Sequence, residues 1–247
     1  MLGPSRRPRV VGTTADKPTV SPEDLERLAT FAVALVPDST AVGLGSGRAA
    51  TAFVRALGAR VRGGLRVHGV PTSQATAALA REVGIPLIDL DRTPLELTVD
   101  GADEVDPDLN LIKGYGGALV RERIVAAASR RQVILVTPDK LVPRLGSRGR
   151  LPVEIVVFAR RLCEARLEAL GCRPELRGGE ARPFLSDNGN WILDCTVAPL
   201  DDPAGLEREI RRIPGVVDTG LFLGTAETVA LAEGGAVRTL RPRTATR

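Results

Sequence analysis

The chain has 247 residues, of which 43% are hydrophobic and 3% aromatic, and it carries a formal net charge of +4. This length suits one large α/β domain, or such a domain with a smaller companion, around an aliphatic core. No apolar run in the sequence approaches the length needed to span a bilayer. The first residues lack the apolar core of a signal peptide, so we expect a cytoplasmic protein.

Much of the excess positive charge lies at the two ends of the chain. We expect residues 1–20 to form a flexible basic leader. Basic patches interleaved with aromatic residues are absent from the sequence, so we expect no nucleic-acid partner. Because no apolar run is long enough to span a bilayer, we expect no membrane partner either. The cysteines, Cys163, Cys172 and Cys195, fit no metal-ligand spacing and are expected to be reduced thiols.

Helices and strands alternate in the first part of the chain. The first helix is expected from Pro22 to Pro37, with Ser21 as its N-cap. Next we expect strand 40–44, helix 48–57, strand 65–70, helix 74–83, strands 86–90 and 95–99, helix 118–128 and strand 132–136. This alternation predicts an α/β fold with a doubly wound, mostly parallel, Rossmann-like sheet and right-handed crossovers.

The pattern changes near Leu151, where a second, smaller α+β domain is expected over residues 151–219. Its expected elements are strand 152–158, helix 159–170, a hairpin of 183–185 with 191–195, helix 203–212 and strand 216–217. Asp187 and Asn188 are assigned to the geometry of the hairpin turn. The last apolar segments are expected to return to the first domain, which then comprises residues 21–150 and 220–247.

Charged residues gather between Asp100 and Ala128, in a segment that joins an apolar strand to a helix through a glycine-rich turn. Open α/β sheets place their chemistry at the carboxyl ends of strands, where this segment begins. Asp100, Asp103 and Lys113 lie in it together, and the glycines that follow break the chain just before the helix. The segment is therefore the candidate active site.

Glu122 lies on the apolar face of the helix in this segment. Ala118 and Leu119 come one turn before it, and Val125 and Ala126 one turn after it. A carboxylate on such a face loses hydration, which raises its pKa and suits it to exchange a proton near neutrality. The alternative is a glutamate that reaches solvent and pairs with an arginine. The other charged residues of the segment favour the catalytic interpretation.

The loop Gly43–Arg48 follows a strand and opens a helix. Backbone N–H groups at such a helix start form an anion site. The dinucleotide fingerprint would need glycine at position 48, and no acidic residue ends a second strand at the usual distance, so we expect no nicotinamide cofactor. We expect the loop amides and the Arg48 guanidinium to hold a small phosphate. The alternative is a tight turn without a ligand.

The acidic residues Asp100, Asp103, Glu104 and Asp106 could suggest a divalent metal. Their spacing misses the calcium-loop pattern, in which ligands fall at alternate positions, and Lys113 would compete with a cation. We therefore expect no metal.

Three further polar residues lie in or beside the expected strand 65–70. His68, the single histidine of the chain, lies in the expected strand 65–70 and is assigned a structural role. Thr72 and Ser73 either contact substrate hydroxyls or cap the helix that follows them.

At these motifs the chain resembles the type A family of ribose-5-phosphate isomerases. The resemblance extends from residue 40 to residue 223, with order and spacing kept. The matching segments are 43–47, 69–73, 100–104, 111–114, 117–122, Lys140, 151–154, 186–190, 213–217 and 220–222. Each motif alone is moderately specific, whereas the ordered set is very specific.

The resemblance implies interconversion of ribose 5-phosphate and ribulose 5-phosphate with no metal or organic cofactor. It makes Glu122 the base that moves a proton between C2 and C1 through an enediolate. It assigns Asp100 and Asp103 to ring opening and hydroxyl contacts, and Lys113 to the developing oxyanion. The implied substrate-binding residues are Ser46, Gly47, Arg48, Ala49, Asp100, Gly101, Ala102, Asp103, Lys113, Gly114, Tyr115, Gly116 and Lys140. It also suggests a homodimer or a homotetramer.

The chain departs from the family's pattern at three places. Arg48 and Ala49 stand where the family usually has Ser-Thr, Glu26 stands where a lysine is common, and Tyr115 replaces a glycine. These changes affect the expected phosphate contacts more than the proton-transfer chemistry.

Two other functions fit the same broad scaffold. A non-catalytic regulatory domain that binds a sugar phosphate would need no proton acceptor such as Glu122. A deaminase of amino-sugar phosphates usually enlists a histidine, for which His68 is badly placed. We therefore favour the isomerase.

Overall fold

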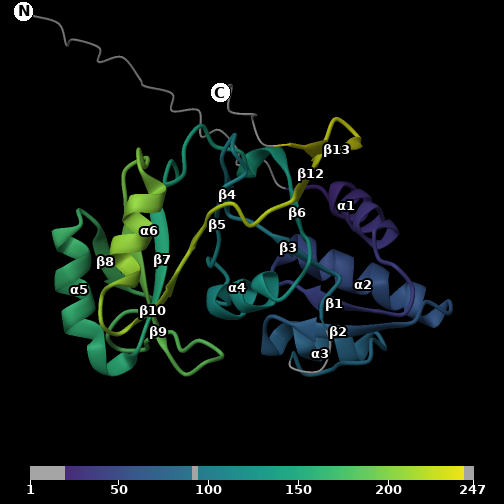
Figure 1. The fold of residues 1–247 in the computed structure, drawn as a ribbon, viewed down its shortest axis with the longest axis horizontal. Coiled ribbons are helices and arrows are strands. Elements are labelled where there is room, and N and C mark those ends of the chain that lie inside the picture. Colours follow the sequence, from purple (N-terminus) through teal and green to yellow (C-terminus); the bar gives the residue numbers. More distant parts are fainter. Residues whose placement is uncertain (1–19, 91–93, 242–247) are drawn as a thin grey trace, which may run out of the picture.

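The structure is a computed structural model that describes residues 20–90 and 94–241. Apart from Val20, the expected basic leader lies outside the described residues, and so does the end of the chain beyond Arg241. Figure 1 shows a larger unit built on a parallel sheet beside a smaller unit that contains α5 and α6.

The larger unit contains a six-stranded sheet with the order β13-β12-β6-β3-β1-β2. All neighbouring strands are parallel except β13, which is antiparallel to β12. The strands are β1 (Thr40–Leu44), β2 (Val67–Pro71), β3 (Leu97–Gly101), β6 (Gln132–Val136), β12 (Thr228–Glu233) and β13 (Ala236–Leu240). The central strands are buried on both faces, as their continuous apolar runs predict, and the expected parallel sheet is confirmed.

Helices cover both faces of this sheet, as a doubly wound fold requires. They are α1 (Pro22–Ala34), α2 (Arg48–Arg62), α3 (Gln74–Glu82) and α4 (Leu119–Ala127). The first two pack together on one face, and α3 packs beside α2 near the edge strand β2. On the opposite face, Val125 of α4 packs with Ala41, Val70 and Leu95.

A small three-stranded sheet shares that opposite face with α4. It has the order β11-β5-β4 and comprises β4 (Glu104–Val105), β5 (Leu111–Ile112) and β11 (Leu221–Phe222). Alternation along β6 explains the packing: Val133 and Leu135 face the helical layer, whereas Ile134 and Val136 face this small sheet.

The smaller unit is an antiparallel sheet with two helices. The sheet has the order β10-β7-β9-β8, with strands β7 (Arg150–Ile155), β8 (Arg173–Leu176), β9 (Trp191–Thr196) and β10 (Val216–Thr219). The helices α5 (Arg160–Ala169) and α6 (Pro203–Arg211) pack on it, and the three cysteines are buried free thiols in its core. We keep the expected division at 151–219 as a proposal, because β10 belongs to this sheet and β11 to the other unit.

Several sequence-based expectations were wrong in detail. Residues 86–90 make one parallel bridge, from Leu87 to Gly69, rather than a strand, because Pro86 has no N–H to continue a ladder. The strand expected to run to Phe158 ends at Ile155, and a short 3₁₀ turn follows it. The segment 183–185 likewise contributes a single bridge. The short strands β4, β5, β8, β11 and β13 were not predicted, and β12 was expected only as an apolar segment that returns to the first domain.

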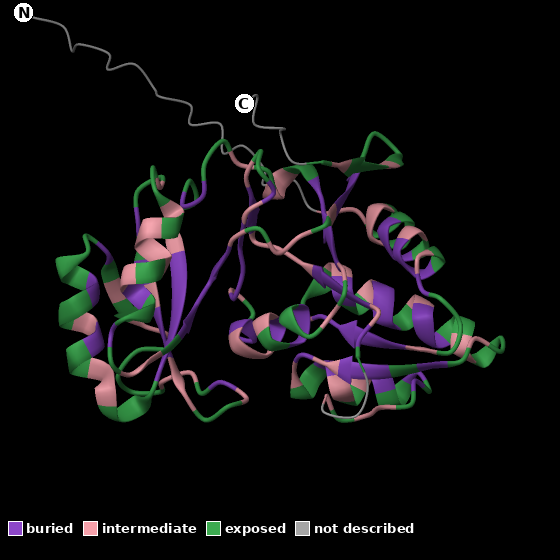
Figure 2. Cartoon of the chain, viewed as in Figure 1, coloured by how far each residue is buried: buried purple, intermediate pink, exposed green. Residues whose placement is uncertain are grey.

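The burial pattern follows the layers. Buried residues lie along the strands and on the inward faces of the helices, and exposed residues occupy the outer faces (Figure 2). Within residues 20–90 and 94–241, no helix has both the length and the apolar character needed to cross a membrane.

Candidate active site

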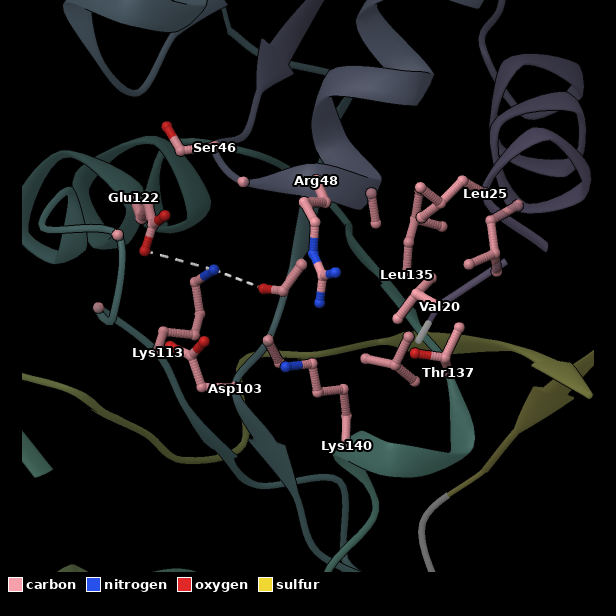
Figure 3. A pocket seen from close by; sticks show the side chains of 18 residues that line it. Val20, Leu25, Ser46, Arg48, Asp103, Lys113, Glu122, Leu135, Thr137 and Lys140 are labelled. Carbon is pink, nitrogen blue, oxygen red and sulfur yellow. Dashed lines mark hydrogen bonds and ion pairs between the residues drawn. The ribbon is translucent and has the colours of Figure 1, made fainter. Parts of the chain in front are cut away.

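A cavity of about 270 Å³ opens where β1, β3 and β6 end (Figure 3). The carboxyl ends of parallel strands share one edge of the sheet, which is where such folds bind ligands. The predicted site residues that line it are Ser46, Gly47, Arg48, Ala49, Gly101, Ala102, Asp103, Lys113, Gly114, Gly116, Glu122 and Lys140. Sequence reasoning missed its apolar wall, to which Val20, Leu25 and Leu28 contribute.

Two predicted substrate-binding residues, Asp100 and Tyr115, are not among the described residues that line the cavity. Asp100 is fully buried behind Lys113. Tyr115 turns its ring toward the smaller unit, where its hydroxyl donates to the Arg150 carbonyl at 3.2 Å. Its backbone N–H contacts a residue that lines the cavity, since it donates to Oδ2 of Asp103 at 2.9 Å.

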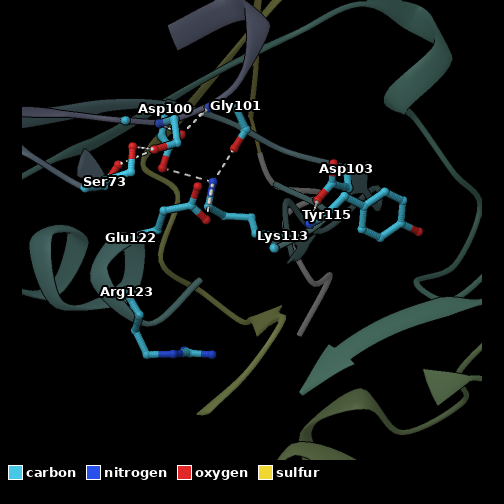
Figure 4. A network of polar contacts seen from close by, with 12 residues as sticks. Ser73, Asp100, Gly101, Asp103, Lys113, Tyr115, Glu122 and Arg123 are labelled. Carbon is cyan, nitrogen blue, oxygen red and sulfur yellow. Dashed lines mark hydrogen bonds and ion pairs between the residues drawn. The ribbon is translucent and has the colours of Figure 1, made fainter. Parts of the chain in front are cut away.

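Lys113 is a buried ammonium between two buried carboxylates (Figure 4). Its Nζ lies 3.0 Å from Oδ2 of Asp100 and 3.3 Å from Oε2 of Glu122. It also donates a hydrogen bond to the Gly101 carbonyl at 2.6 Å. Three segments meet here: the end of β3, the residue after β5 and the first turn of α4.

The charges in this cluster shift one another's pKa values. Burial raises the pKa of Glu122 from 4.5 to about 8, and the Asp100 carboxylate adds to that rise, while Lys113 opposes it. Burial lowers the pKa of Lys113, but the charges of Asp100 and Glu122 outweigh burial and hold it above its ordinary value. At neutral pH the cluster therefore contains a permanent ammonium and a carboxyl, that of Glu122, poised to exchange a proton.

Asp103 is the second carboxylate on the cavity surface. Burial raises its pKa, and the Tyr115 N–H, Lys113 and Lys140 act in the opposite direction. Figure 3 shows the side chains of Asp103 and Lys113 close together on the wall below Glu122. A polar group of a ligand in the cavity would therefore meet both carboxylates and the ammonium.

Two cationic side chains also line the cavity. The side chains of Arg48 and Lys140 both extend into it (Figure 3). Arg48 is also the first residue of α2, whose N-cap Gly47 has φ +90° and leaves space for a ligand, since a Cβ there would meet nothing within 4 Å. A helix N-terminus and two cations form a site suited to a phosphate.

A cluster of hydroxyl groups supports this loop from behind. Ser46 Oγ lies 2.9 Å from the hydroxyls of Thr72 and Ser73 and 3.2 Å from that of Thr76. The Ser46 N–H donates to Oδ1 of Asp100 at 3.1 Å, so the loop and the charged cluster are joined. Ser73 is the N-cap of α3, which confirms one of its two sequence interpretations.

The comparisons with known proteins agree with this geometry. The sequence model of the family described as ribose 5-phosphate isomerase A (phosphoriboisomerase A) matches residues 68–235. A ribose-5-phosphate isomerase A of Thermomicrobium roseum is 53% identical over 89% of this chain and 94% of its own length. The chain belongs to the ribose 5-phosphate isomerase A family.

Solved structures of the ribose 5-phosphate isomerase A family have the same fold. The enzyme of Methanocaldococcus jannaschii is 40% identical, with a TM-score of 0.85 over 90% of this chain and 100% of its own. A D-ribose-5-phosphate isomerase in complex with phospho-erythronic acid is 35% identical, with a TM-score of 0.85 over 89% of this chain and 98% of its own.

The remaining predicted residues of this family member lie away from the chemistry. His68 is exposed on β2, and the cavity-lining residues described do not include it. Glu26 is exposed on α1, while its neighbour Leu25 faces the cavity. In the part of the chain that the structure describes, no group of three His, Cys, Asp or Glu side chains is arranged to hold a metal ion.

Replacing Glu122 by Gln should weaken the pH dependence of stability. A carboxyl whose pKa is raised by folding contributes stability that is fully present below its unfolded pKa, near 4.5, and is lost as pH rises through about 8. The glutamine side chain of Glu122→Gln has nearly the shape of the protonated carboxyl and is uncharged at every pH. Urea unfolding between about pH 5 and about pH 9 should show the wild type losing stability relative to this variant.

The control is Glu168→Gln, because Glu168 is exposed on α5 and its removal should leave the wild-type pH dependence intact. Parallel stability curves for wild type and Glu122→Gln would contradict the raised pKa.

Proposed function

We propose that this chain is an aldose–ketose isomerase that interconverts D-ribose 5-phosphate and D-ribulose 5-phosphate, a step of the non-oxidative pentose phosphate pathway. The observation that carries the proposal is the buried Glu122 carboxyl beside the Lys113 ammonium on the wall of a cavity that Arg48 and Lys140 also line. This arrangement supplies a base, an oxyanion partner and a phosphate site in one enclosed space.

Glu122 is the base. It takes the proton from C2 of the open-chain aldose, and the electron pair of the C2–H bond becomes the C1=C2 bond of the enediolate while O1 takes the negative charge. Glu122 then returns the proton to C1, and the hydroxyl proton of O2 moves to O1, so that C2 becomes the carbonyl carbon. The reaction is redox-neutral, because the hydrogen and its electrons stay within the sugar. A pKa of about 8 lets one carboxyl accept and release this proton near neutral pH.

Lys113 stabilises the negative charge that develops on the sugar oxygens. Its ammonium is buried and protonated, so it meets this charge in a water-poor site, where such an interaction is strong. Asp100 holds Lys113 in place from behind and keeps it charged. Asp103, which lines the cavity, is the group for ring opening and hydroxyl contacts.

The phosphate of the substrate lies beside the cationic side chains of the cavity. Arg48, Lys140 and the N–H groups at the start of α2 bind it, with Ser46, Gly47 and Ala49 forming the rest of the loop. Gly101, Ala102, Gly114 and Gly116 also line the cavity, and the carbon chain of the sugar packs against them. Phospho-erythronic acid, found in a related isomerase, has a planar anionic carboxyl group and a phosphate, like the enediolate intermediate.

The setting of this activity is also part of the proposal. We place the enzyme in the cytoplasm as a homodimer or homotetramer that acts on small phosphorylated sugars without a cofactor. The buried free thiols of Cys163, Cys172 and Cys195 are consistent with a reducing compartment.

Metal-stripped, purified protein should convert ribose 5-phosphate to its ketose, and Glu122→Gln should lower kcat by about 10³-fold or more because it removes the base. The ketose can be followed directly. Glu168→Gln should keep wild-type activity, and circular dichroism should show that both variants are folded. Full activity of Glu122→Gln would remove Glu122 from the mechanism, and binding without turnover by the wild type would favour a regulatory domain.

Arg48→Ala should raise the KM for ribose 5-phosphate by about tenfold or more, because a charge-assisted hydrogen bond to the phosphate is lost. Its kcat should change by less than about threefold, since the variant leaves the proton-transfer groups in place. Arg60→Ala, at an exposed position near the other end of α2, is the matched control. An unchanged KM for Arg48→Ala would show that Arg48 does not bind the phosphate.

A further inference from the structure

The loop Ser186–Asn190 reaches from the smaller unit toward α3 and α4 of the larger unit (Figure 1). It lies between Leu185 and β9, more than fifty residues along the chain from either helix. Its Asp187 and Asn188 side chains also bond to residues outside the turn, so their earlier assignment to turn geometry alone was incomplete.

A fully buried carboxylate fixes the shape of this loop. Oε1 of Glu154, on β7, accepts hydrogen bonds from Ser186 Oγ at 2.8 Å, Asn188 Nδ2 at 3.1 Å and Asn190 Nδ2 at 2.9 Å. Three donors on one oxygen offset part of the cost of burying this carboxylate. The loop is thereby a rigid projection of the smaller sheet, because its own side chains anchor it to a central strand.

The projection ends on the first turn of α3. Oδ2 of Asp187 accepts the backbone N–H of Gln74 at 2.6 Å. That N–H is one of the groups that a helix start cannot satisfy by itself, and the positive end of the helix dipole favours a carboxylate there. Ser73, the N-cap of α3, accepts another of these amides, that of Thr76. Thus a residue of the smaller unit contributes to the cap of α3.

Arg121 provides a second contact, from α4. Its Nε donates to Oδ1 of Asn188 at 2.9 Å, and its Nη2 donates to the Asp187 carbonyl at 2.8 Å. Arg121 directly precedes Glu122 in the helix. The loop therefore ties together the start of α3 and the helix that carries the base.

The glycine turn before α4 rests on the same part of the smaller unit. Arg177, which follows β8, donates to the carbonyls of Gly114 at 3.1 Å and Tyr115 at 3.3 Å. Phe184 packs against Gly117 so closely that a Cβ at that glycine would lie 2.5 Å from the ring. The turn between Lys113 and Glu122, and the residue directly before Glu122, are thus placed against residues 177–190.

From α3 the contacts continue to the charged cluster. Ser73 bonds to Ser46, the Ser46 N–H bonds to Asp100, and Asp100 pairs with Lys113. Each of these links is 3.1 Å or shorter. A shift of the α3 start would move the loop at the cavity wall and the partner of the catalytic lysine together.

We propose that Asp187 is a positioning residue for the isomerisation: by capping α3 from the smaller unit, together with the Arg121 contact, it holds Ser46, Lys113 and Glu122 in register. The proposal rests on the isomerase function proposed above. Asp187 acts through other residues and does not touch the substrate. The smaller unit is therefore required to set the geometry of the site, although none of its residues was predicted to belong to it.

Asp187→Ala should lower kcat about tenfold in the full-length protein, because misplacement of reacting groups by a fraction of an ångström slows proton transfer. KM should change by less than about threefold. Asp187→Asn keeps an oxygen that can accept the Gln74 N–H, so it should keep at least about half of the wild-type kcat.

The matched control is Asp202→Ala. Asp202 also caps a helix through its side chain, since Oδ1 accepts the Gly205 N–H at 2.8 Å at the start of α6. This variant loses a comparable cap without touching the loop, so kcat should stay within about twofold of wild type. A kcat for Asp187→Ala within that same range, or an equal fall in both alanine variants, would overturn the proposal.

Arg121→Ala tests whether the two contacts act together. Both contacts hold the same loop, so their losses should not multiply. The kcat of the double variant Asp187→Ala/Arg121→Ala should lie within about twofold of the kcat of the slower single variant. Multiplicative losses would show that the contacts are independent and would overturn the proposal.

Hydrogen exchange separates this proposal from the proposed function. Amides in the first turns of α3 and α4 should exchange about fivefold faster in Asp187→Ala than in Asp202→Ala. This result is expected even if the wild type does not isomerise ribose 5-phosphate, an outcome that would contradict the proposed function alone. Equal exchange in the two variants would overturn the positioning role by itself.

Discussion

The site depends on the burial of one ammonium, that of Lys113, between Asp100 and Glu122. Removing each of these charges from water costs several kcal/mol, and only close pairing and further hydrogen bonds offset that cost. Asp100 meets this requirement most completely, because it accepts the N–H groups of Ser46 and Gly101 as well as pairing with Lys113. The lysine and this aspartate balance each other, so a second negative charge, on Glu122, is disfavoured until the pH approaches 8.

The fold supplies the close approaches that this pairing needs. Gly45 lies so near Asp100 that a Cβ at position 45 would be 2.4 Å from the carboxyl group. Gly43 similarly leaves room for Thr98 and Val125, and so lets α4 approach the sheet. Glycine is needed at these two positions because the backbone of β1, and of the residue after it, lies too close to β3 for a larger side chain. The charged cluster is therefore a consequence of where two parallel strands end.

Sequence patterns predicted the parts of the site that lie on regular elements. The bounds of β1 and β6 agree with their apolar runs, and the helical spacing around Glu122 correctly indicated a buried carboxyl with a raised pKa. The strands β4 and β5, which deliver Lys113, were missed because two-residue strands show no periodicity. The turn of Tyr115 away from the cavity was missed because it depends on packing against Arg150, far along the chain.

The smaller unit was hardest to connect to the chemistry. The hydrogen bond from Gln74 to Asp187 joins residues 113 positions apart, and no local pattern marks such a contact. Asp187, Asn188 and Gly189 are also typical turn residues. The turn alone accounted for their presence in the sequence, so their contacts with α3 and α4 were not predicted. The structure shows that such a turn can be both a hairpin connection and a cap for a distant helix.

The most direct test of the account is a titration of the Glu122 carboxyl in the ligand-free protein. Carbon-13 NMR of glutamate-labelled protein, with the resonance assigned by its absence in Glu122→Gln, would give its midpoint. Burial beside a satisfied Lys113–Asp100 pair predicts a midpoint of about 8. A midpoint near 4.5, the ordinary value for glutamate, would show that the carboxyl is not held as described and would contradict the central claim.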